Sequence, residues 1–446
     1  MNPALSAFLS KRLIDRRGGH RARVLEAFDA RRRLERSNRS LINDAVGESL
    51  ARLLNHARST VPRFRDVVSG AITAANARDL LARWPVMTKA AIQAAPASFT
   101  SAAHIAMREN STGGSSGNPM VFMMDDDRQV SGEAAHLWAN SIAGWRYGER
   151  IAMLWGADRD VRGAVGTWRK ALRCRVENIR WYNAFDMGEA RMERFHEELT
   201  RFRPHLVIAY SGSVFAFARF LEARGLVPEY PSGGIVSSAE MVTKEMRDVV
   251  ERVFRRPVFD RYGSREFGPL ASECEAHNGL HQNETDCVVE VDSPDPFRVP
   301  GRVLITYLHN LAMPFIRYDT GDLGLFLSFE PCSCGRQTMR MAPFVGRVCD
   351  LIRTRSGKMI HGEYFTHVLY GTNDVKEFQF VQEDLDRYRL LLVADRGKIG
   401  PLEELWRGKI LEVLDPGSQV QIEYVDEIPA LPSGKRRFTL SRIAAA

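Results

Sequence analysis

One stretch of small and polar residues carries the clearest chemical signal in this sequence: Ser111-Thr112-Gly113-Gly114-Ser115-Ser116-Gly117-Asn118-Pro119. Glycine lets the backbone turn so that successive N–H groups point at an anion, and serine and threonine hydroxyls add further donors. The stretch lacks the Gly-Lys-Ser/Thr ending of a P-loop. It therefore predicts either a phosphate cradle without a lysine of its own or a flexible surface loop.

A second candidate is Tyr262-Gly263-Ser264-Arg265-Glu266, at the end of a strand expected over residues 258–262. In open α/β sheets, ligands gather beyond the carboxyl ends of the strands. There the ring of Tyr262 could stack on a nucleobase, and the carboxylate of Glu266 could hold Mg²⁺ bound to phosphates. The alternative interpretation is a Tyr-Gly turn with a surface glutamate.

Three more candidates follow toward the C-terminus. Asp322, in a Tyr-Asp-Thr-Gly-Asp turn, suits hydrogen bonds from ribose hydroxyls, although it could equally be structural. Arg347, in Gly-Arg-Val-Cys-Asp, stands where the character of the sequence changes and suits a hinge between domains. Lys435 follows Pro-Ser-Gly in a loop close to the end of the chain, where basic residues usually form a solvated tail.

The six cysteines favour a metal site over disulfides, since a chain of this size without a secretion signal rarely forms a disulfide framework. Cys274, His281, Cys332 and Cys334 make a Cys₃His set, which is typical of closed structural zinc sites. His277 and Cys287 are alternative ligands. Buried free thiols are the alternative to a metal.

Length and composition describe an ordinary globular protein of more than one domain: 446 residues, 44% hydrophobic and 26% charged. No apolar run approaches the ~20 residues that span a bilayer. The first apolar stretch, over residues 3–9, is too short for a secretory core, and its charges follow it. We expect a cytoplasmic protein.

The net charge of +7 is concentrated in the first 40 residues, which hold 11 Lys/Arg and 4 Asp/Glu. Arg31-Arg32-Arg33 could attract nucleic acid. No aromatic residues are interleaved for base stacking, so a solvated helix face is the preferred interpretation and no nucleic-acid partner is expected.

Short apolar runs alternate with helical periodicity from residue 132 to 262, which predicts a parallel α/β fold. Amphipathic helices are expected within 20–57, and a β-rich subdomain over about 264–346. The remainder is a compact α+β unit. The expected helices are 132–145, 189–202, 214–224, 244–254 and 402–414. The expected strands are 151–156, 205–210, 234–236, 258–262, 287–291, 301–307, 323–329, 376–382, 388–394 and 420–425.

These motifs, taken in order, resemble those of the adenylate-forming (acyl-CoA synthetase-like) superfamily, closest to its phenylacetate–CoA ligase and capsule-biosynthesis CapK-like branch. The resemblance runs from about residue 80 to the end. It implies a basic helical arm (1–60), a large N-terminal α/β domain (61–346) and a small mobile C-terminal domain (347–446). It also implies a Cys/His cluster in the β-rich part, and a homodimer.

The resemblance also implies site roles, which carry over by position. Residues 111–117 would hold the β- and γ-phosphates of ATP. Tyr262, with Gly263 and the opposing Ser238-Ala239-Glu240, would enclose adenine. Glu266 would bind Mg²⁺, Asp322 the ribose, and Arg347 ribose or phosphate. Lys435 would bridge the α-phosphate and the substrate carboxylate. Trp138, Trp145, Tyr147, Trp155 and Tyr210 are candidates for an acid pocket, against a role in the core.

The implied reaction is activation of an aryl or acyl acid as its adenylate, followed by transfer to a thiol, foremost that of coenzyme A. An amine, an alcohol or a carrier protein, in polysaccharide or natural-product biosynthesis, is the alternative acceptor. Three departures from the family's motifs leave an alternative of another functional class, a nucleotide-binding protein without catalytic activity. Asn118 and Met120 replace the usual lysine segment, Arg265 replaces a Ser/Thr, and Cys349 occupies the hinge position beside Asp350.

Overall fold

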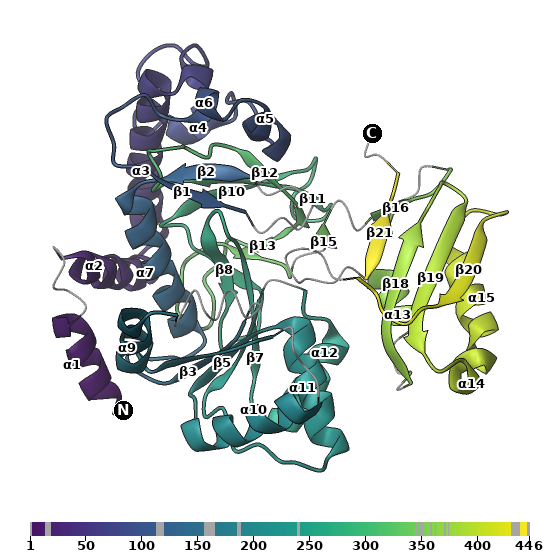
Figure 1. Cartoon of the computed structure of the whole chain (residues 1–446). Helices are drawn as coiled ribbons and strands as arrows, with labels where there is room; N and C mark the ends of the chain where they lie inside the picture. The colour runs from purple at the N-terminus through teal and green to yellow at the C-terminus, as the bar shows by residue number, and fades with distance from the viewer. Residues whose placement is uncertain are drawn as a thin grey trace.

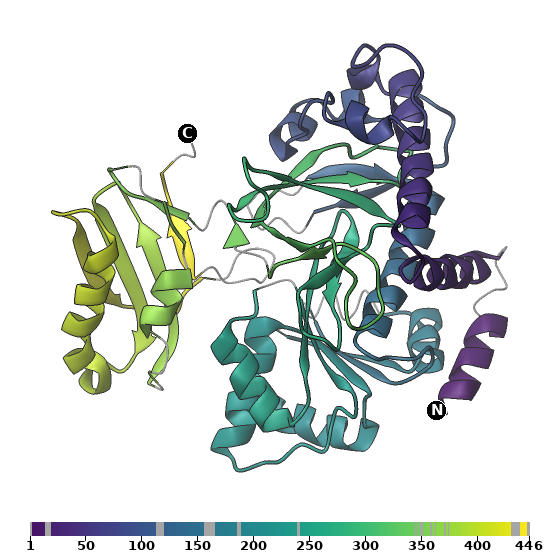
Figure 2. The same cartoon turned by 180° about the vertical axis from the view of Figure 1, so that it is seen from behind.

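The computed structural model describes residues 2–13, 19–112, 120–155, 166–184, 189–238, 241–343, 346–347, 351–356, 359–361, 363–369, 372, 374–429 and 438–443. Figures 1 and 2 show a large body formed by the first three quarters of the chain, with a smaller unit beside it. The N-terminus lies on the side of the large body away from that unit. Within the described ranges, no helix is long and apolar enough to cross a membrane.

A nine-stranded sheet forms the centre of the large body, in the order β13-β14-β9-β8-β7-β6-β5-β3-β4. The pairs from β4 through β7 are parallel, and those from β7 to β13 are antiparallel. The parallel strands are β3 (Ile151–Leu154), β4 (Ile179–Tyr182), β5 (Leu206–Tyr210), β6 (Gly234–Ser238) and β7 (Val258–Ser264). The antiparallel ones are β8 (Gly268–Glu273), β9 (Leu280–Gln282), β13 (Phe326–Ser328) and β14 (Arg340–Met341).

Strands β3 and β5 are apolar along their whole length because helices cover both faces of the sheet there. In β5, Val207 and Ala209 pack into the core beneath three helices on one face, and Leu206 and Ile208 pack toward the end of α7 on the other. The helices on the first face are α10 (Glu189–Phe202), α11 (Ser211–Ala223) and α12 (Lys244–Phe254). Helices α7 (Asp126–Ile142) and α9 (Trp168–Val176) lie on the other side of the sheet (Figure 1).

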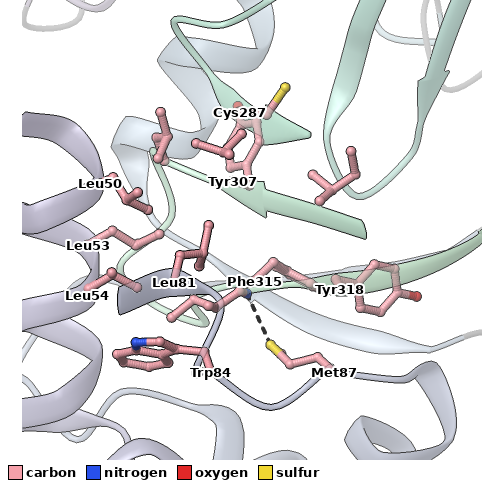
Figure 3. Close-up of a cluster of buried hydrophobic side chains, with 14 of the residues drawn as sticks. Leu50, Leu53, Leu54, Leu81, Trp84, Met87, Cys287, Tyr307, Phe315 and Tyr318 are labelled. Carbon is pink, nitrogen blue, oxygen red and sulfur yellow. Dashed lines mark hydrogen bonds between the residues drawn. The ribbon is translucent and has the colours of Figure 1, made fainter. Parts of the chain in front are cut away.

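A second, four-stranded sheet packs against the N-terminal helices. Its order is β10-β11-β12-β15, from β10 (Cys287–Asp292), β11 (Gly301–Tyr307), β12 (Tyr318–Gly324) and β15 (Gly346–Arg347). Figure 3 shows the core between this sheet and α3, with Leu50, Leu53 and Leu54 facing Phe315 and Tyr318. The surrounding elements are α3 (Arg39–Thr60), η1 (Pro62–Phe64), α4 (Ala77–Leu81), α5 (Lys89–Ala94) and α6 (Pro96–Phe99), and the hairpin of β1 (Arg108–Ser111) and β2 (Val121–Met124).

Helix α2 (His20–Leu34) follows α1 (Pro3–Leu13) and packs on α7 through Val24 and Phe28. Arg31 is only 3% exposed and pairs with the buried carboxylate of Asp286. Arg32 and Arg33 face solvent. The prediction that these arginines lie on a solvated helix face is therefore wrong for Arg31, because this residue is buried in an ion pair with Asp286.

The smaller unit has a four-stranded sheet, β20-β19-β18-β21, with its own hydrophobic core. The strands of this sheet are β18 (Val375–Gln382), β19 (Arg387–Ala394), β20 (Gln419–Tyr424) and β21 (Thr439–Ser441). The unit also contains a two-stranded sheet of β16 (Leu351–Arg353) and β17 (Met359–His361). Its helices are α13 (Glu363–Leu369), α14 (Arg396–Ile399), η3 (Gly400–Leu402) and α15 (Glu403–Val413). The α+β pattern expected here is confirmed.

One expectation about a strand is wrong. The single strand expected over 323–329 is divided at Leu325, where the chain passes from the four-stranded sheet to the nine-stranded one. The segment 264–346 is β-rich, as expected, and contributes to both sheets: β8, β9, β13 and β14 extend the central sheet, and β10, β11, β12 and β15 form the other. Strand β4 and helix α9 were not expected.

Candidate active site and metal cluster

The candidate site lies at the carboxyl ends of β6 and β7, where the sequence places its ligand-binding residues. Ser238 ends β6 and pairs with Arg261 of β7. Its hydroxyl donates to the carbonyl oxygen of Arg261 at 3.2 Å. Arg261 is 5% exposed, and burial lowers the pKa of its guanidinium to about 10. A cation therefore lies immediately behind this edge of the sheet.

Tyr262 and Asp322 meet across the two sheets. The Tyr262 hydroxyl donates to Oδ2 of Asp322 at 2.8 Å. Asp322 is 9% exposed, on β12, and its backbone pairs with Arg347 of β15. Three predicted nucleotide-binding residues thus come together from segments up to 85 positions apart in the sequence.

The turn after β7 is closed tightly around Gly263. A Cβ atom there would lie 2.4 Å from the carbonyl oxygen of Gly268 on β8, so only glycine fits. The turn presents Arg265, which is exposed, and Glu266, which is half-buried. Within the described part of the chain, neither side chain makes a hydrogen bond or an ion pair. Both are therefore available to a ligand.

Ser111 and Thr112 form the base of the glycine-rich loop. Ser111 ends β1 and pairs with Val121 of β2. Thr112 is buried; its backbone N–H donates to the Met120 carbonyl, and its hydroxyl accepts the Met120 N–H at 2.8 Å. The threonine therefore joins the two ends of the loop, and no other described residue accepts its hydroxyl proton.

Several predicted residues fall outside the described part of the chain: Gly113, Gly114, Ser115, Ser116, Gly117, Asn118, Ala239, Glu240, Cys349 and Lys435. Arg347 is described only by its backbone pairing. Their roles remain predictions.

The five aromatic candidates separate into two groups. Trp155 and Tyr210 stack at 4.4 Å between ring centroids, and each immediately follows or ends a parallel strand at the candidate edge. Trp138 instead donates to Glu35 in the core. Trp145 is buried, and Tyr147 contacts Arg21 and Ser10.

Sequence reasoning missed two residues of α7 that underlie the turn after β7. Arg128 donates through Nε and Nη2 to the Glu266 carbonyl oxygen, at 3.0 and 2.8 Å. His136, two turns further along the helix, reaches solvent, and its Nε2 lies 3.9 Å from where a Cβ of Gly268 would be. Partial desolvation, followed by the nearby cations Arg261 and Arg128, lowers the pKa of His136.

Cys274, His281, Cys332 and Cys334 form one cluster, with their ligand atoms all within 4.8 Å of one another. The Cys274 and Cys332 sulfurs are 3.9 Å apart, and the Cys334 sulfur is 3.4 Å from Nε2 of His281. Nδ1 of His281 lies 2.9 Å from the Thr338 hydroxyl, which orients the ring, as hydrogen-bond partners of metal-binding histidines do.

The electrostatics of the cluster favour a neutral histidine. Burial, followed by Arg336 and Arg340, lowers the pKa of His281 to about 3. Burial raises the pKa of the Cys274 thiol to about 12. Burial also acts to raise the pKa of Cys332, but hydrogen bonds to its sulfur, foremost from the Cys334 backbone N–H, outweigh it and lower the pKa.

The two alternative ligands do not join the cluster. His277 pairs with Glu273 at 3.1 Å and stacks on Phe259. Cys287 donates to the carbonyl of Asn283. The predicted combination of four ligands is therefore the one that the fold assembles.

Comparison with known proteins gives matches to a family model, to two related sequences and to solved structures. The CapK C-terminal domain matches residues 352–442. Protein CapK of Staphylococcus aureus is 25% identical over 267 residues, which cover 58% of each chain. Phenylacetate-coenzyme A ligase of Thermus thermophilus is 35% identical over 163 residues, covering 34% of this chain and 36% of that protein. Each sequence match thus spans less than two thirds of the relative.

Solved structures extend the likeness to the overall fold. A 2-hydroxyisobutyryl-CoA ligase in the postadenylation state, in complex with 2-HIB-AMP, has a TM-score of 0.70 at 18% identity, over 92% of this chain and 91% of that one. A fatty acyl-adenylate ligase structure has a TM-score of 0.56 at 15% identity, over 74% and 67%. The resemblance is therefore confirmed: the chain has the fold of the adenylate-forming CoA ligases, carries a CapK C-terminal domain, and is related to protein CapK and phenylacetate–coenzyme A ligase.

Proposed function

We propose that this protein activates a carboxylic acid with ATP as an acyl adenylate and then transfers the acyl group to a thiol, foremost that of coenzyme A. The observation that carries the proposal is the contact between Tyr262 and Asp322. It joins the residue assigned to the adenine to the residue assigned to the ribose, at the strand edge where ligands of α/β sheets gather. The relationship to phenylacetate–coenzyme A ligase supports the reaction class.

In this proposal the acid and the nucleotide meet beyond β6 and β7. Tyr262 supports the adenine, and Asp322 accepts hydrogen bonds from the ribose hydroxyls. The backbone and hydroxyl donors of residues 111–117 bind the phosphates of the departing pyrophosphate. Lys435 brings a positive charge between the α-phosphate and the attacking carboxylate. Arg265, exposed on the turn, could clamp either of these anions through its planar fork.

Glu266 is suited to Mg²⁺ because its half-buried carboxylate makes no hydrogen bond or ion pair within the described residues. A bound Mg²⁺ would neutralise charge on the phosphates as pyrophosphate leaves. The chain's contribution is to present one hard oxygen ligand at a fixed position on the turn after β7.

The Cys/His cluster is suited to a structural Zn²⁺. Three sulfurs and one imidazole nitrogen, within 4.8 Å of one another, need only a small contraction toward the roughly 3.5 Å separations of a tetrahedral site. Zn²⁺ there would tie the hairpin of β8 and β9 to the turn at Cys332–Cys334, beside α2 and α7. The domain bounds, the homodimer and the cytoplasmic location expected from the sequence stay predictions.

The direct test is carboxylate-dependent ATP–pyrophosphate exchange over a panel of aryl, fatty and amino acids. Trapping the product with coenzyme A, amines, alcohols and a carrier protein identifies the acceptor. At least one acid should support exchange, and coenzyme A should accept the acyl group. ATP binding without exchange for any acid would instead favour a nucleotide-binding protein without turnover.

Lys435→Ala separates the two half-reactions. The variant should lose exchange yet form thioester from a supplied acyl adenylate, because the lysine acts only in adenylation. Lys409→Ala, which removes an exposed lysine of α15 in the same unit, should keep both. Full exchange by Lys435→Ala would refute the assigned role.

A further inference from the structure

We propose that Arg128 is a positioning residue that fixes Glu266, the carboxylate assigned to Mg²⁺, relative to the glycine-rich loop. The inference rests on the proposed function, since it takes Glu266 and the loop to act on one nucleotide. It concerns how the chain holds that carboxylate, which neither the glycine-rich motif nor the Tyr-Gly-x-x-Glu motif reveals.

Contacts on three sides hold the Arg128 guanidinium in one place. Nε and Nη2 both donate to the Glu266 carbonyl oxygen, at 3.0 and 2.8 Å. The guanidinium lies over the ring of Tyr307, 4.9 Å from its centroid. One turn along the helix, a Cβ at Gly132 would lie 2.3 Å from Nη1, so only glycine leaves room for the side chain.

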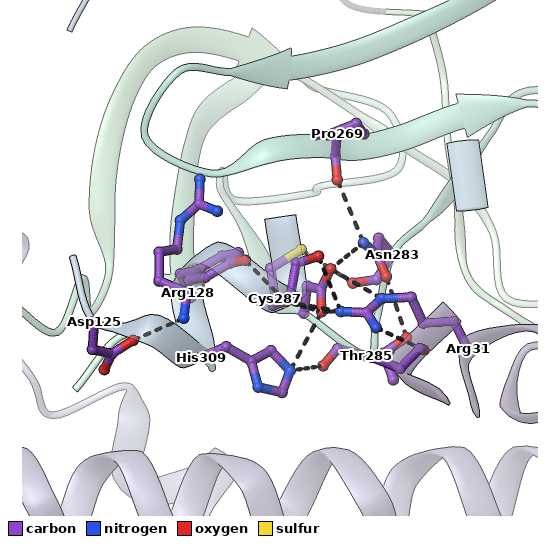
Figure 4. Close-up of polar contacts among 12 residues, drawn as sticks. Arg31, Asp125, Arg128, Pro269, Asn283, Thr285, Cys287 and His309 are labelled. Atoms are coloured by element: carbon purple, nitrogen blue, oxygen red, sulfur yellow. Dashed lines mark hydrogen bonds and ion pairs between the residues drawn. The ribbon is translucent and has the colours of Figure 1, made fainter. Parts of the chain in front are cut away.

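The same helical turn is fixed to the hairpin that carries the loop. Strand β2 runs directly into Asp125, the N-cap of α7. The Asp125 carboxylate accepts the backbone N–H of Arg128 at 2.7 Å and that of Leu311 at 2.6 Å. Figure 4 shows this capping contact, with the Arg128 side chain extending away from it. A short, hydrogen-bonded path therefore connects the base of the loop to the Glu266 backbone.

Stability of the hairpin alone does not explain a buried arginine at position 128. It is 6% exposed, and its cation meets a neutral carbonyl and an aromatic face, with no ion pair among the described residues. Moving a cation out of water is unfavourable, and neutral partners offset that loss only in part. A planar fork does, however, hold one carbonyl more rigidly than a neutral side chain would. That rigidity suits a ligand whose position sets metal affinity.

The test measures metal binding directly, in the full-length protein. Mn²⁺ is titrated in the presence of α,β-methylene-ATP, and free Mn²⁺ is followed by its electron paramagnetic resonance signal. The methylene bridge between the α- and β-phosphates is not cleaved, so this analogue cannot transfer AMP to an acid. Arg128→Met should weaken nucleotide-dependent Mn²⁺ binding roughly 10- to 100-fold, the usual effect of losing a partner behind a metal ligand. Arg128→Lys, which keeps the charge and one donor, should recover part of the affinity.

Arg256→Met is the matched control. Its guanidinium also holds backbone carbonyls, those of Pro231 and Ser232 at 3.0 and 3.1 Å, but at the opposite, amino end of β7. It should leave Mn²⁺ affinity within about twofold. In exchange assays, Arg128→Met should raise the Mg²⁺ concentration needed for half-maximal rate and leave the KM for the acid nearly unchanged.

Unchanged Mn²⁺ affinity in folded Arg128→Met would overturn the proposal. Should that variant fail to fold, Arg128→Lys decides, and wild-type affinity in it would likewise overturn the proposal. Failure of the proposed function is read separately, on the wild type: no acid-dependent exchange at any Mg²⁺ concentration would refute it whatever Arg128 does.

Discussion

Arg31→Met is predicted to destabilise the protein strongly, because it leaves the Asp286 carboxylate buried without its cation. Asp286 is 1% exposed and receives both Nε and Nη2 of Arg31. It also accepts the Ser131 hydroxyl at 2.8 Å and the Asn283 amide at 2.6 Å, and His309 lies 3.3 Å away. Figure 4 shows Arg31, Asn283 and His309 converging on this point.

The expected cost follows from what remains around the carboxylate. Removing one partner of a buried ion pair costs about 3–5 kcal/mol. Two neutral donors and His309 stay in place, so the lower end of that range, about 3 kcal/mol at neutral pH, is expected. Methionine keeps most of the arginine's apolar volume, so little of the loss comes from a cavity.

The pH dependence has a definite sign. In the wild type, burial acts to raise the pKa of Asp286, but Arg31 and then His309 outweigh it and hold the pKa below its usual value. This stabilisation is present above the unfolded-state pKa and is lost as pH falls through the folded-state pKa. Without Arg31, burial raises the pKa instead, so the folded variant gains a proton. The deficit of Arg31→Met should therefore shrink from pH 8 to pH 5.

Urea unfolding of a double-mutant cycle measures the interaction. Arg31→Met with Asp286→Asn should recover much of the loss, since the buried charge is then gone, and the coupling should exceed 1 kcal/mol, roughly. Arg33→Met, on the exposed side of the same helix, should change stability by less than about 0.5 kcal/mol. Additive single effects, or a cost of Arg31→Met no larger than that of Arg33→Met, would refute the reasoning.

Two further predictions concern the metal cluster and a buried acid. Chelator treatment should remove one zinc per chain and lower Tm, and Cys332→Ser should lower Tm equally. Cys174→Ser, outside the cluster, should leave Tm unchanged. A metal content well below one zinc per chain in untreated protein would contradict the zinc assignment. Burial, then Glu273, raises the pKa of Asp260 to about 7, so its ionisation destabilises the fold as pH rises from 4 toward 7. Asp260→Asn should therefore raise Tm more at pH 8 than at pH 5, and an equal change at both would exclude this origin.

Four parallel strands of the central sheet, β3, β5, β6 and β7, could be predicted because each is or begins with a short apolar run after a helix. Helix α12 begins at Lys244 and ends at Phe254, where periodicity places both ends, with Thr243 capping its first turn. Strand β4 was missed, since Ile-Arg-Trp-Tyr has neither an apolar run nor a clean alternation. It forms because β3 supplies a parallel partner with all four residues in register.

The site was predictable as a set of motifs but not as a set of contacts. Tyr262 and Asp322 lie 60 positions apart on different sheets, and nothing local to either indicates that they meet. The choice of Arg31 over Arg32 for burial depends on Asp286, 255 positions away. The cysteine spacing suggested four ligands, but their closure requires β9 to pair with β14, which brings His281 opposite Arg340.

Helix α7 explains why the stability test and the metal test can be separated. Ser131, on one face, receives the Arg31 guanidinium, whereas Arg128 reaches the Glu266 carbonyl from the first turn. Asp125 fixes that first turn through Arg128 and Leu311 without using Arg31. Loss of Arg31 therefore removes a contact from a helix that stays capped and packed, and the folded fraction of Arg31→Met should bind Mn²⁺ with nucleotide as the wild type does. Arg31 on α2 and Arg128 on α7 both bind at α7, but only Arg128 touches the turn that carries the metal ligand.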